Sequence, residues 1–421
     1  MRDPLQITLQ EEIVSVLDFT QEITDEAVYR VIDLMLLKKS KQMYLPLQRM
    51  VKLRDTLFNS IRRLDVLQEL LDRSDITEIM INGYDQIFIE KEGKITKWNE
   101  QFVSKEKFHD VIQQIVASAN RVVNETSPIV DARLQDGSRV HVVLEPISLD
   151  GSALTIRKFP SEAMTMQDLV NLGALSQSIA QMLQFLVRSG VNIFISGGTG
   201  SGKTTFLNAL SGYIEEEKRV VTIEDSAELQ LIGMPNLVRL ESRNANMEGE
   251  NQITIRDLLK ASLRMRPDFI VIGEIRGEEA LDMLQALNTG HSGFSTGHAN
   301  HCKDMLSRIE TMVLMGMEMP LPAIRSQIAS AIDVIVHLGR LRDRSRKVLE
   351  ITEILSYEDG EIQTNCLFRF KETGEEGGKI KGEWVKKGRW KRIEKLELSG
   401  HLSDYQAIEQ EIEDEQHSNS I

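Results

Sequence analysis

This chain carries, at residues 196–205, the stretch Ser196-Gly197-Gly198-Thr199-Gly200-Ser201-Gly202-Lys203-Thr204-Thr205. From Gly197 to Thr204 it fits the pattern Gly-x-x-x-x-Gly-Lys-Ser/Thr of a loop that holds nucleotide phosphates. A short apolar, partly β-branched run at 191–195 precedes the stretch, and residues 204–212 can continue as a helix. Strand, loop and helix in this order are the context that the motif requires. The stretch therefore predicts a phosphate-binding loop in an α/β domain.

The residue types in the loop indicate how it would bind a nucleotide. Small residues let successive backbone N–H groups point at phosphate oxygens, and the helix N-terminus adds the positive end of its dipole. Lys203 would bridge the β- and γ-phosphates of ATP, and the Thr204 hydroxyl would hold Mg²⁺. The predicted nucleotide-binding residues are Gly197, Gly198, Thr199, Gly200, Ser201, Gly202, Lys203, Thr204 and Thr205.

Length and composition limit the possible classes of protein. A chain of 421 residues is too long for one compact core and predicts two or three domains. The net charge of −14 gives no electrostatic footprint for nucleic acid, so no direct nucleic-acid partner is expected. No apolar run is long enough to span a membrane and Met1-Arg2-Asp3-Pro4 opens no signal peptide, so we expect a cytosolic protein. Its two cysteines, Cys302 and Cys366, are too few for a four-thiolate zinc site, and we interpret them as bystanders.

Apolar periodicity divides the chain into consecutive parts. Residues 25–41 and 47–72 repeat apolar positions every three to four residues, as helices do, whereas alternating and Gly-bounded runs after Asp75 predict antiparallel strands. From residue 166 to about 355, helices alternate with short apolar strands, which is typical of a mainly parallel sheet. The predicted parts are a helical segment at 1–60, a small α+β domain at 61–160, a linker at 161–167, a P-loop ATPase domain at 168–355, and a C-terminal hairpin with an acidic tail at 356–421.

The C-terminal part allows more than one interpretation. Residues 379–395 carry eight basic residues with Trp384 and Trp390, which fits either a patch for nucleic acid or anionic lipid, or a twisted hairpin with a solvated basic face. We favour the hairpin. The last twenty residues carry six acids and no Lys or Arg, and predict a frayed helix or a disordered tail.

Carboxylates follow two of the four strands predicted in the ATPase domain. These strands cover 191–195, 219–223, 269–272 and 331–338. Ligands of open α/β sheets bind at the carboxyl ends of strands, where Glu224 and Asp225 follow the second strand and Glu274 follows the third. A magnesium nucleotide site needs acids for the metal, for its bound waters and for orienting the attacking water. We therefore predict an ATP- and Mg²⁺-dependent site at this edge.

Four ordered motifs resemble those of the type II and type IV secretion ATPases. They are the phosphate loop, Thr222-Ile223-Glu224-Asp225, Asp268-Phe269-Ile270-Val271-Ile272-Gly273-Glu274-Ile275-Arg276-Gly277, and the segment from Thr289-Gly290-His291-Ser292-Gly293 to Gly297-His298-Ala299-Asn300. Asp136-Gly137-Ser138-Arg139-Val140 and the segment 154–159 are similar to the CpaF/TadA branch, the ATPases of Flp (tight-adherence) pilus assembly. The resemblance covers about residues 70–355 and implies a RecA-like P-loop NTPase core.

The resemblance also implies roles for individual residues. Glu224 would polarise the attacking water, Glu274 matches the Walker B acid that acts on Mg²⁺, and His298 matches a γ-phosphate sensor. Gly273 stands where many other P-loop enzymes have Asp. The resembled family shares this departure. We further interpret Gly290, Gly293 and Gly297 as making the loop around His298 pliable enough to respond to a lost phosphate.

Arginines of the first domain suggest an assembly. An arginine supplied by a neighbouring subunit is worth about 10³ to 10⁵ in the rate of phosphoryl transfer. Arg139 and Arg157 match family arginines that reach the nucleotide between domains or subunits, with Arg133 as a weaker third; ordinary surface ion pairs are the alternative. Further basic candidates are Arg243, Arg256, Arg264 and Arg266.

The resemblance implies a homo-hexameric ring at the cytoplasmic face of the inner membrane. Nucleotide would drive rotation of one domain against the other, and force would pass to an inner-membrane platform protein, through which the ATPase is peripheral to the membrane. Three hypotheses follow: a Flp-type pilus or secretion motor, a conjugation-type type IV secretion ATPase, and a regulatory module that binds ATP with little hydrolysis. Intact Lys203, Thr204, Glu224, Glu274 and His298 argue against the last one.

Overall fold

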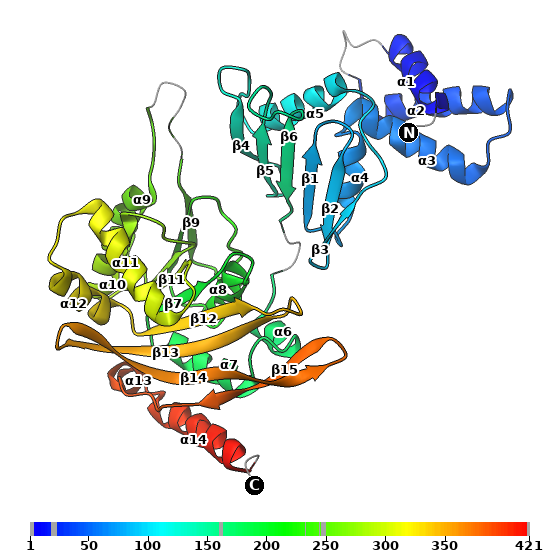
Figure 1. Cartoon of the computed structure of the whole chain (residues 1–421). Coiled ribbons are helices and arrows are strands. Elements are labelled where there is room, and N and C mark those ends of the chain that lie inside the picture. The colour runs from blue at the N-terminus through cyan, green and yellow to red at the C-terminus, as the bar shows by residue number, and fades with distance from the viewer. Residues whose placement is uncertain are drawn as a thin grey trace. The chain divides into compact units, whose positions relative to one another are not determined.

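A computed structural model describes residues 4–17, 23–159, 163–231, 233–243, 245 and 250–418. The chain divides into two compact units, Met1–Ser161 and Glu162–Ile421 (Figure 1). Residues 161 and 162 of the predicted linker lie outside the described residues, as does the end of the predicted tail at 419–421. The last two linker residues already start a helix, because Thr165 caps α6 (Met166–Asn171) through a capping box with Asp168.

The first unit begins with three helices, α1 (Pro4–Val16), α2 (Asp25–Ser40) and α3 (Leu47–Arg62). The Thr24 side chain caps α2 by accepting the N–H of Ala27. Apolar side chains at helical spacing form the bundle core: Leu9, Ile13, Val28, Ile32, Leu36, Leu53, Leu57 and Phe58. The helical pattern predicted through residue 72 is interrupted at Asp65, whose φ of 54° ends it before α4 (Val66–Asp72).

The rest of this unit is a small α+β fold. Its antiparallel sheet has the order β3-β2-β1-β6-β5-β4. The strands are β1 (Glu78–Asn82), β2 (Ile87–Lys91), β3 (Lys94–Lys97), β4 (Ile129–Arg133), β5 (Arg139–Val143) and β6 (Ala153–Arg157). Helix α5 (Lys105–Ser118) begins at the Ser104 cap and packs its apolar stripe, with Phe108 and Ile112, onto the buried face of the sheet.

The second unit is built on a sheet that comprises, within the described residues, nine strands in the order β15-β14-β13-β12-β7-β11-β10-β8-β9. Strands β12 to β9 of this order are parallel, and β13, β14 and β15 add antiparallel at one side. Their bounds are β7 (Ile193–Gly197), β8 (Val220–Glu224), β9 (Leu237–Glu241), β10 (Phe269–Ile272), β11 (Ser292–Gly297), β12 (Val334–Arg340), β13 (Arg346–Glu358), β14 (Glu361–Glu376) and β15 (Lys379–Lys386).

Helices cover both faces of this sheet, as the alternating pattern predicts (Figure 1). One core contains residues of α7 (Gln177–Arg188) and α8 (Lys203–Ser211), joined by α13 (Glu394–Leu398) and α14 (Leu402–Ser418). The other contains α9 (Ile255–Ser262), α10 (Glu279–Asn288), α11 (Cys302–Gly316) and α12 (Leu321–Ala331). The central strands β7, β8 and β10 are buried on both faces.

Three features of the sheet differ from the sequence expectation. Residues 292–297, which we interpreted as part of a pliable loop, form the buried strand β11 between β7 and β10. Gly293 and Gly297 are packing residues: a Cβ on Gly293 would lie 2.7 Å from the carbonyl oxygen of Ile270, and one on Gly297 would lie 2.9 Å from Cε of Met305. The short strand β9 was also not expected, and the boundary predicted at residue 355 falls inside β13.

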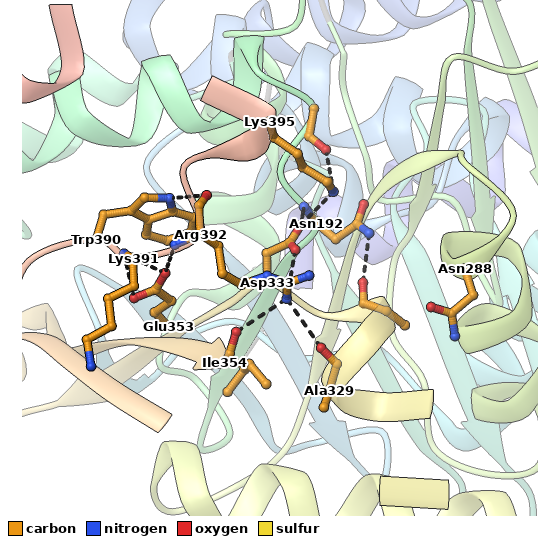
Figure 2. Close-up of polar contacts among 12 residues, drawn as sticks. Asn192, Asn288, Ala329, Asp333, Glu353, Ile354, Trp390, Lys391, Arg392 and Lys395 are labelled. Carbon is orange, nitrogen blue, oxygen red and sulfur yellow. Dashed lines mark hydrogen bonds and ion pairs between the residues drawn. The ribbon is translucent and has the colours of Figure 1, made fainter. Parts of the chain in front are cut away.

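The C-terminal segment is fastened to the sheet by two buried carboxylates (Figure 2). Asp333 accepts the N–H of Asn192 and forms ion pairs with Arg392 at 3.0 Å and Lys395 at 2.6 Å. Glu353 accepts the backbone N–H groups of Lys391 and Arg392 at 2.9 and 2.7 Å. Because buried charges need such partners, these contacts fix residues 391–395 against the amino-terminal side of β12 and against β13.

The basic stretch and the acidic tail turn out to face each other. Lys386 is buried and lies 2.8 Å from Glu413 of α14, so the basic face is not solvated there. Tyr405 and Ile412 of α14 are buried in the core, so this part of the predicted tail is a packed helix. Lys386 and Arg389 of the stretch thus pair with Glu413 of the chain's own acidic tail.

Candidate active site

The phosphate loop joins β7 to α8, as its motif predicts. Gly197 ends β7 where the backbone passes close to β12, and a Cβ there would lie only 2.5 Å from the carbonyl oxygen of Leu338. Gly202 has a φ of 92° at the N-cap of α8, a conformation that favours glycine. The glycines are thus required both by close packing and by the turn into the helix, and Lys203 is the first residue of α8.

Lys203 is held inside the loop. Its Nζ donates to the carbonyl oxygens of Gly197 and Gly198, both at 3.2 Å. Burial lowers the pKa of Lys203, since it disfavours the charged ammonium. A phosphate bound in the loop would place a negative charge next to the buried ammonium and so stabilise its charged form.

His298 connects Lys203 to Glu274. It follows the carboxyl end of β11, where Lys203 Nζ lies 3.3 Å from its Nδ1 and Glu274 Oε1 lies 2.9 Å from its Nε2. An ammonium can only donate, so Nδ1 accepts and the proton of a neutral imidazole resides on Nε2, the ring nitrogen that lies near Glu274. Burial and the neighbouring Lys203 charge lower the pKa of His298, which favours this neutral form. The structure thus brings together three of the predicted catalytic residues.

The segment carrying Glu274 is positioned by β11. Thr296 donates its hydroxyl to the carbonyl oxygen of Gly273 at 2.7 Å and accepts the N–H of Ile275 at 3.0 Å. Arg276, for which the sequence suggested no role, donates to Oε2 of Glu274 at 2.6 and 3.0 Å. Glu274 is therefore fixed between an arginine and the histidine.

Glu224 is a buried carboxylate at the end of β8, with 3 % of its surface exposed. Its Oε1 accepts the N–H groups of Glu228 and Leu229 at 2.8 and 3.0 Å, while Oε2 is buried and has no partner among the described residues. Burial raises the pKa of Glu224 to about 7, in spite of the two N–H donors. It lies against Gly273, where a Cβ would come within 3.0 Å of its Cγ. The absence of a side chain at position 273 thus makes room for Glu224 next to the Glu274 segment.

Two arginines at the loop were not predicted. Arg346 Nε donates to the carbonyl oxygen of Gly200 at 2.9 Å, and Arg340 NH1 would lie 3.8 Å from a Cβ on that glycine. They oppose each other in the β12–β13 pair, and β12 is the parallel neighbour of β7. Arg340 is the last residue of β12 but lies two residues beyond the predicted end of that strand at residue 338, so the strand-end rule pointed close to it; nothing in the sequence marks Arg346.

The other residues predicted for the site lie in different parts of the structure. Thr204 and Thr205 lie in the first turn of α8. Arg139 and Arg157 oppose each other on β5 and β6 of the first unit, and Arg133 opposes Arg139 on β4. Asp225 accepts a hydrogen bond from the Ser242 hydroxyl, and Arg256 forms an ion pair with the buried Asp282 at 2.7 Å. Both side chains therefore have partners within the fold. Arg243 donates to the carbonyl oxygen of Asn251, and Arg264 and Arg266 lie between α9 and β10.

The donor set fits magnesium nucleotide. Within the described residues no group of three or more His, Cys, Asp or Glu side chains could hold a metal ion by itself. Mg²⁺ characteristically takes one or two protein oxygens together with substrate phosphates and water, which the Thr204 hydroxyl and the Glu274 carboxylate can supply. The buried Oε2 of Glu224 and the buried Ser201 hydroxyl, neither with a partner in the described part of the chain, are polar atoms of the kind that a ligand or its waters would satisfy.

Comparison with known proteins agrees with this site. The family described as "Type II/IV secretion system protein" matches residues 62–418. This chain belongs to that family. It is 31 % identical over 314 residues to the conjugal transfer protein TrbB of Rhizobium radiobacter, covering 73 % of this chain and 93 % of the relative. It is 32 % identical over 324 residues to the type IV secretion system protein PtlH of Bordetella pertussis, covering 70 % and 94 %.

A solved structure has a fold similar to that of this chain. The pilus retraction motor PilT, crystallised with ADP, is 19 % identical, with a TM-score of 0.51 over 82 % of this chain and 89 % of that chain. At this identity the likeness concerns the fold alone. Among the described residues, no helix combines the length and the apolar character that crossing a membrane demands.

Proposed function

We propose that this secretion family protein is an ATP-hydrolysing motor that takes ATP with Mg²⁺ as its cofactors. The observation that carries the proposal is the continuous contact from Lys203 through His298 to Glu274, at the carboxyl ends of adjacent parallel strands. A loop lysine and a magnesium-type acid are parts of phosphoryl-transfer sites, and the histidine that contacts both lies where a change at the γ-phosphate would alter its surroundings. A merely structural glycine-rich turn would need none of the three.

In this proposal each side chain has a distinct task. The loop backbone and Lys203 would bind the phosphates, and the Thr204 hydroxyl and the Glu274 carboxylate would hold Mg²⁺, which would supply positive charge for phosphoryl transfer. Glu224, with a pKa of about 7, is suited to accept a proton from the attacking water at neutral pH. His298 touches both Lys203 and Glu274, so loss of the γ-phosphate changes its contacts and is passed on through β11.

We also propose that Arg346 contacts a bound phosphate from the same subunit. Its guanidinium is hydrogen-bonded to the loop at Gly200 and exposed beyond it, so that a small rotation redirects its donors. Arg340 would add a second positive charge at the same edge. Guanidinium groups are suited to phosphate recognition because of their planar fork of donors.

The arginine row of the first unit supports a ring. Arg133, Arg139 and Arg157 occupy directly opposed positions on three neighbouring strands, so their side chains share one face of the sheet. Because Arg139 and Arg157 also match the family's arginines, we propose that they reach the nucleotide of a neighbouring subunit in a homo-hexamer. A head-to-tail interface of this kind closes into a ring.

The machine that the motor serves is proposed on two grounds. The segments 136–140 and 154–159 resemble the CpaF/TadA branch, which favours assembly of a Flp-type pilus through an inner-membrane platform protein, with the ATPase cytoplasmic and peripheral to that membrane. The relatives named for conjugal transfer and type IV secretion favour a conjugation-type machine instead. Deleting the gene decides between them: loss of surface pili supports the first and loss of DNA or effector transfer supports the second.

The activity itself is tested by Mg²⁺-dependent phosphate release from ATP at increasing protein concentration. We expect specific activity to rise with concentration and to fall by about 10³ in Lys203→Ala, Glu274→Gln and Arg139→Ala. Arg342→Ala is the matched control, because Arg342 is occupied by ion pairs with Glu372 and Glu375. ATP binding without hydrolysis would instead support the regulatory module, and activity indifferent to Arg139 would contradict the ring.

A further inference from the structure

We propose that the turn end of the α2–α3 hairpin, residues 34–51, docks on the surface of an anionic lipid membrane. We call these residues the hairpin tip. They precede residues 62–418, which match the secretion family. They belong to the first unit, whereas the nucleotide site lies in the second. The proposal is therefore independent of the ATPase activity.

The pairing of α2 with α3 places the hairpin tip at one end. Contacts spaced one helical turn apart join the two helices: Asp25 with Arg62 at 2.9 Å, the stacked rings of Tyr29 and Phe58 with centroids 3.9 Å apart, and Asp33 with Arg54 at 2.6 Å. They fix the helices antiparallel, so the residues beyond Asp33 and before Arg54 lie together where the chain turns. The opposite end of the hairpin is held by Lys107, which donates to the carbonyl oxygen of Ser60.

The hairpin tip exposes large apolar side chains. On α2 the core takes Val28, Ile32 and Leu36, so Leu34 and Leu37 point away from it. The exposed fractions are 60 % for Leu34, 54 % for Leu37, 39 % for Met43, 87 % for Tyr44, 76 % for Leu47 and 51 % for Val51. Scattered exposed leucines are ordinary in proteins, but six large exposed apolar residues gathered in the single stretch 34–51 indicate an interaction site.

Its charge is opposite to that of the whole chain. From residue 34 to residue 54 the sequence contains Lys38, Lys39, Lys41, Arg49, Lys52 and Arg54 and no acid, in a chain with a net charge of −14. Arg54 is paired with Asp33, and Lys52 lies 3.3 Å from Glu100. Lys38 and Lys41 are exposed and lie on the same helical face as Leu34 and Leu37.

Lysines beside protruding leucines and a tyrosine suit an anionic lipid surface. Apolar side chains enter the boundary of headgroups and acyl chains, the lysines remain at the headgroups, and tyrosine prefers that boundary. Tyr44 and Leu47 protrude at the turn, and a soft lipid layer accepts protruding side chains without a preformed cavity. The negative leaflet charge also complements the basic tip.

The experiment measures co-sedimentation of the full chain, without nucleotide, with vesicles of phosphatidylglycerol and phosphatidylcholine in equal parts. Vesicles of phosphatidylcholine alone are the comparison. We expect binding to the anionic vesicles only, and weaker binding when NaCl is raised from ~0.1 M to ~1 M, where the Debye length falls from about 10 Å to about 3 Å.

Paired variants separate the hairpin tip from general charge and exposure. Lys38→Gln with Lys41→Gln should weaken binding about 25-fold, roughly fivefold for each lysine. The control is Lys94→Gln with Lys97→Gln, which removes the same charge from the exposed strand β3. Tyr44→Ser with Leu47→Ser should weaken binding at least about tenfold, whereas Leu398→Ser, at a leucine that is 89 % exposed, should leave it unchanged.

Each of the following three outcomes would overturn the proposal. One is equal binding to both kinds of vesicle, or none to either. A second is an equal loss in the control variants, which would make the binding a matter of net charge. Third, if Tyr44→Ser with Leu47→Ser changes the sedimentation coefficient of the protein in the absence of vesicles, the hairpin tip is an interface between protein chains instead.

Discussion

Glu224 shows how one residue's surroundings determine when it holds a proton. An exposed glutamic acid has a pKa near 4.5, and burial raises the value for Glu224 to about 7. Between these two values the folded protein holds a proton that the unfolded chain has released. The contribution of Glu224 to stability is therefore fully present below pH 4.5 and is lost as the pH rises through 7.

Glu224→Gln tests this directly. The amide has no charge to desolvate, so at pH 8 the variant should have a free energy of unfolding up to about 3 kcal/mol above that of the unmodified protein, with little difference near about pH 4. Urea unfolding at both pH values, without nucleotide, measures it. Asp225→Asn is the control, since Asp225 is exposed. The same Glu224 variant should lose ATP hydrolysis, and equal stability changes at both pH values would contradict the assigned burial effect.

Arg346 offers a second residue-scale prediction. If its guanidinium turns from Gly200 to a phosphate, Arg346→Ala should weaken binding of a fluorescent ATP analogue by about 10-fold, the typical worth of a hydrogen bond to a charged group. Arg342→Ala, in the same hairpin connection but paired with Glu372, should bind as before. Equal affinity of both variants would restrict Arg346 to supporting the loop backbone.

At the scale of elements, β11 explains why His298 is reliably placed. The sequence around it indicates a glycine-rich loop because glycine has low strand propensity. The strand nevertheless forms, since β7 and β10 supply hydrogen bonds on both sides and Leu287 and Met305 fill the space above its glycines. Such tertiary contacts override local propensity, and a single sequence does not reveal them.

The C-terminal segment provides an element-scale prediction. Glu353 is fully buried and accepts three N–H groups, from Lys391, Arg392 and the Asn365 side chain. In Glu353→Gln the new NH₂ group faces these donors, so the free energy of unfolding should fall by about 2 to 3 kcal/mol. Limited proteolysis should then cut before α14 sooner than in Glu361→Gln, whose site is exposed. Unchanged cleavage would mean that the ion pairs of Asp333 and Glu413 and the apolar contacts of α14 hold the segment without Glu353.

At the scale of the whole molecule, a shared site between subunits predicts complementation. Lys203→Ala has an intact first-unit arginine row, and Arg139→Ala has an intact phosphate loop. Mixed in equal amounts and allowed to exchange, they should form rings in which about a quarter of the interfaces carry both intact parts. Phosphate release should recover to about that fraction. Failure to recover, with exchange of labelled subunits confirmed, would place Arg139 in its own subunit's site.

The sequence by itself determined the phosphate loop, the central parallel strands and the acids after them, because these depend on local patterns. A Gly-rich turn between a buried strand and a helix is recognisable from neighbours alone, and so are Glu224 and Glu274 at strand ends. Only the tertiary structure decided that His298 lies between Lys203 and Glu274, that Arg346 meets the loop from residues far along the chain, and that the basic stretch packs against α14. These contacts join segments distant in sequence, and their pairing depends on sheet order and packing, which no local pattern records.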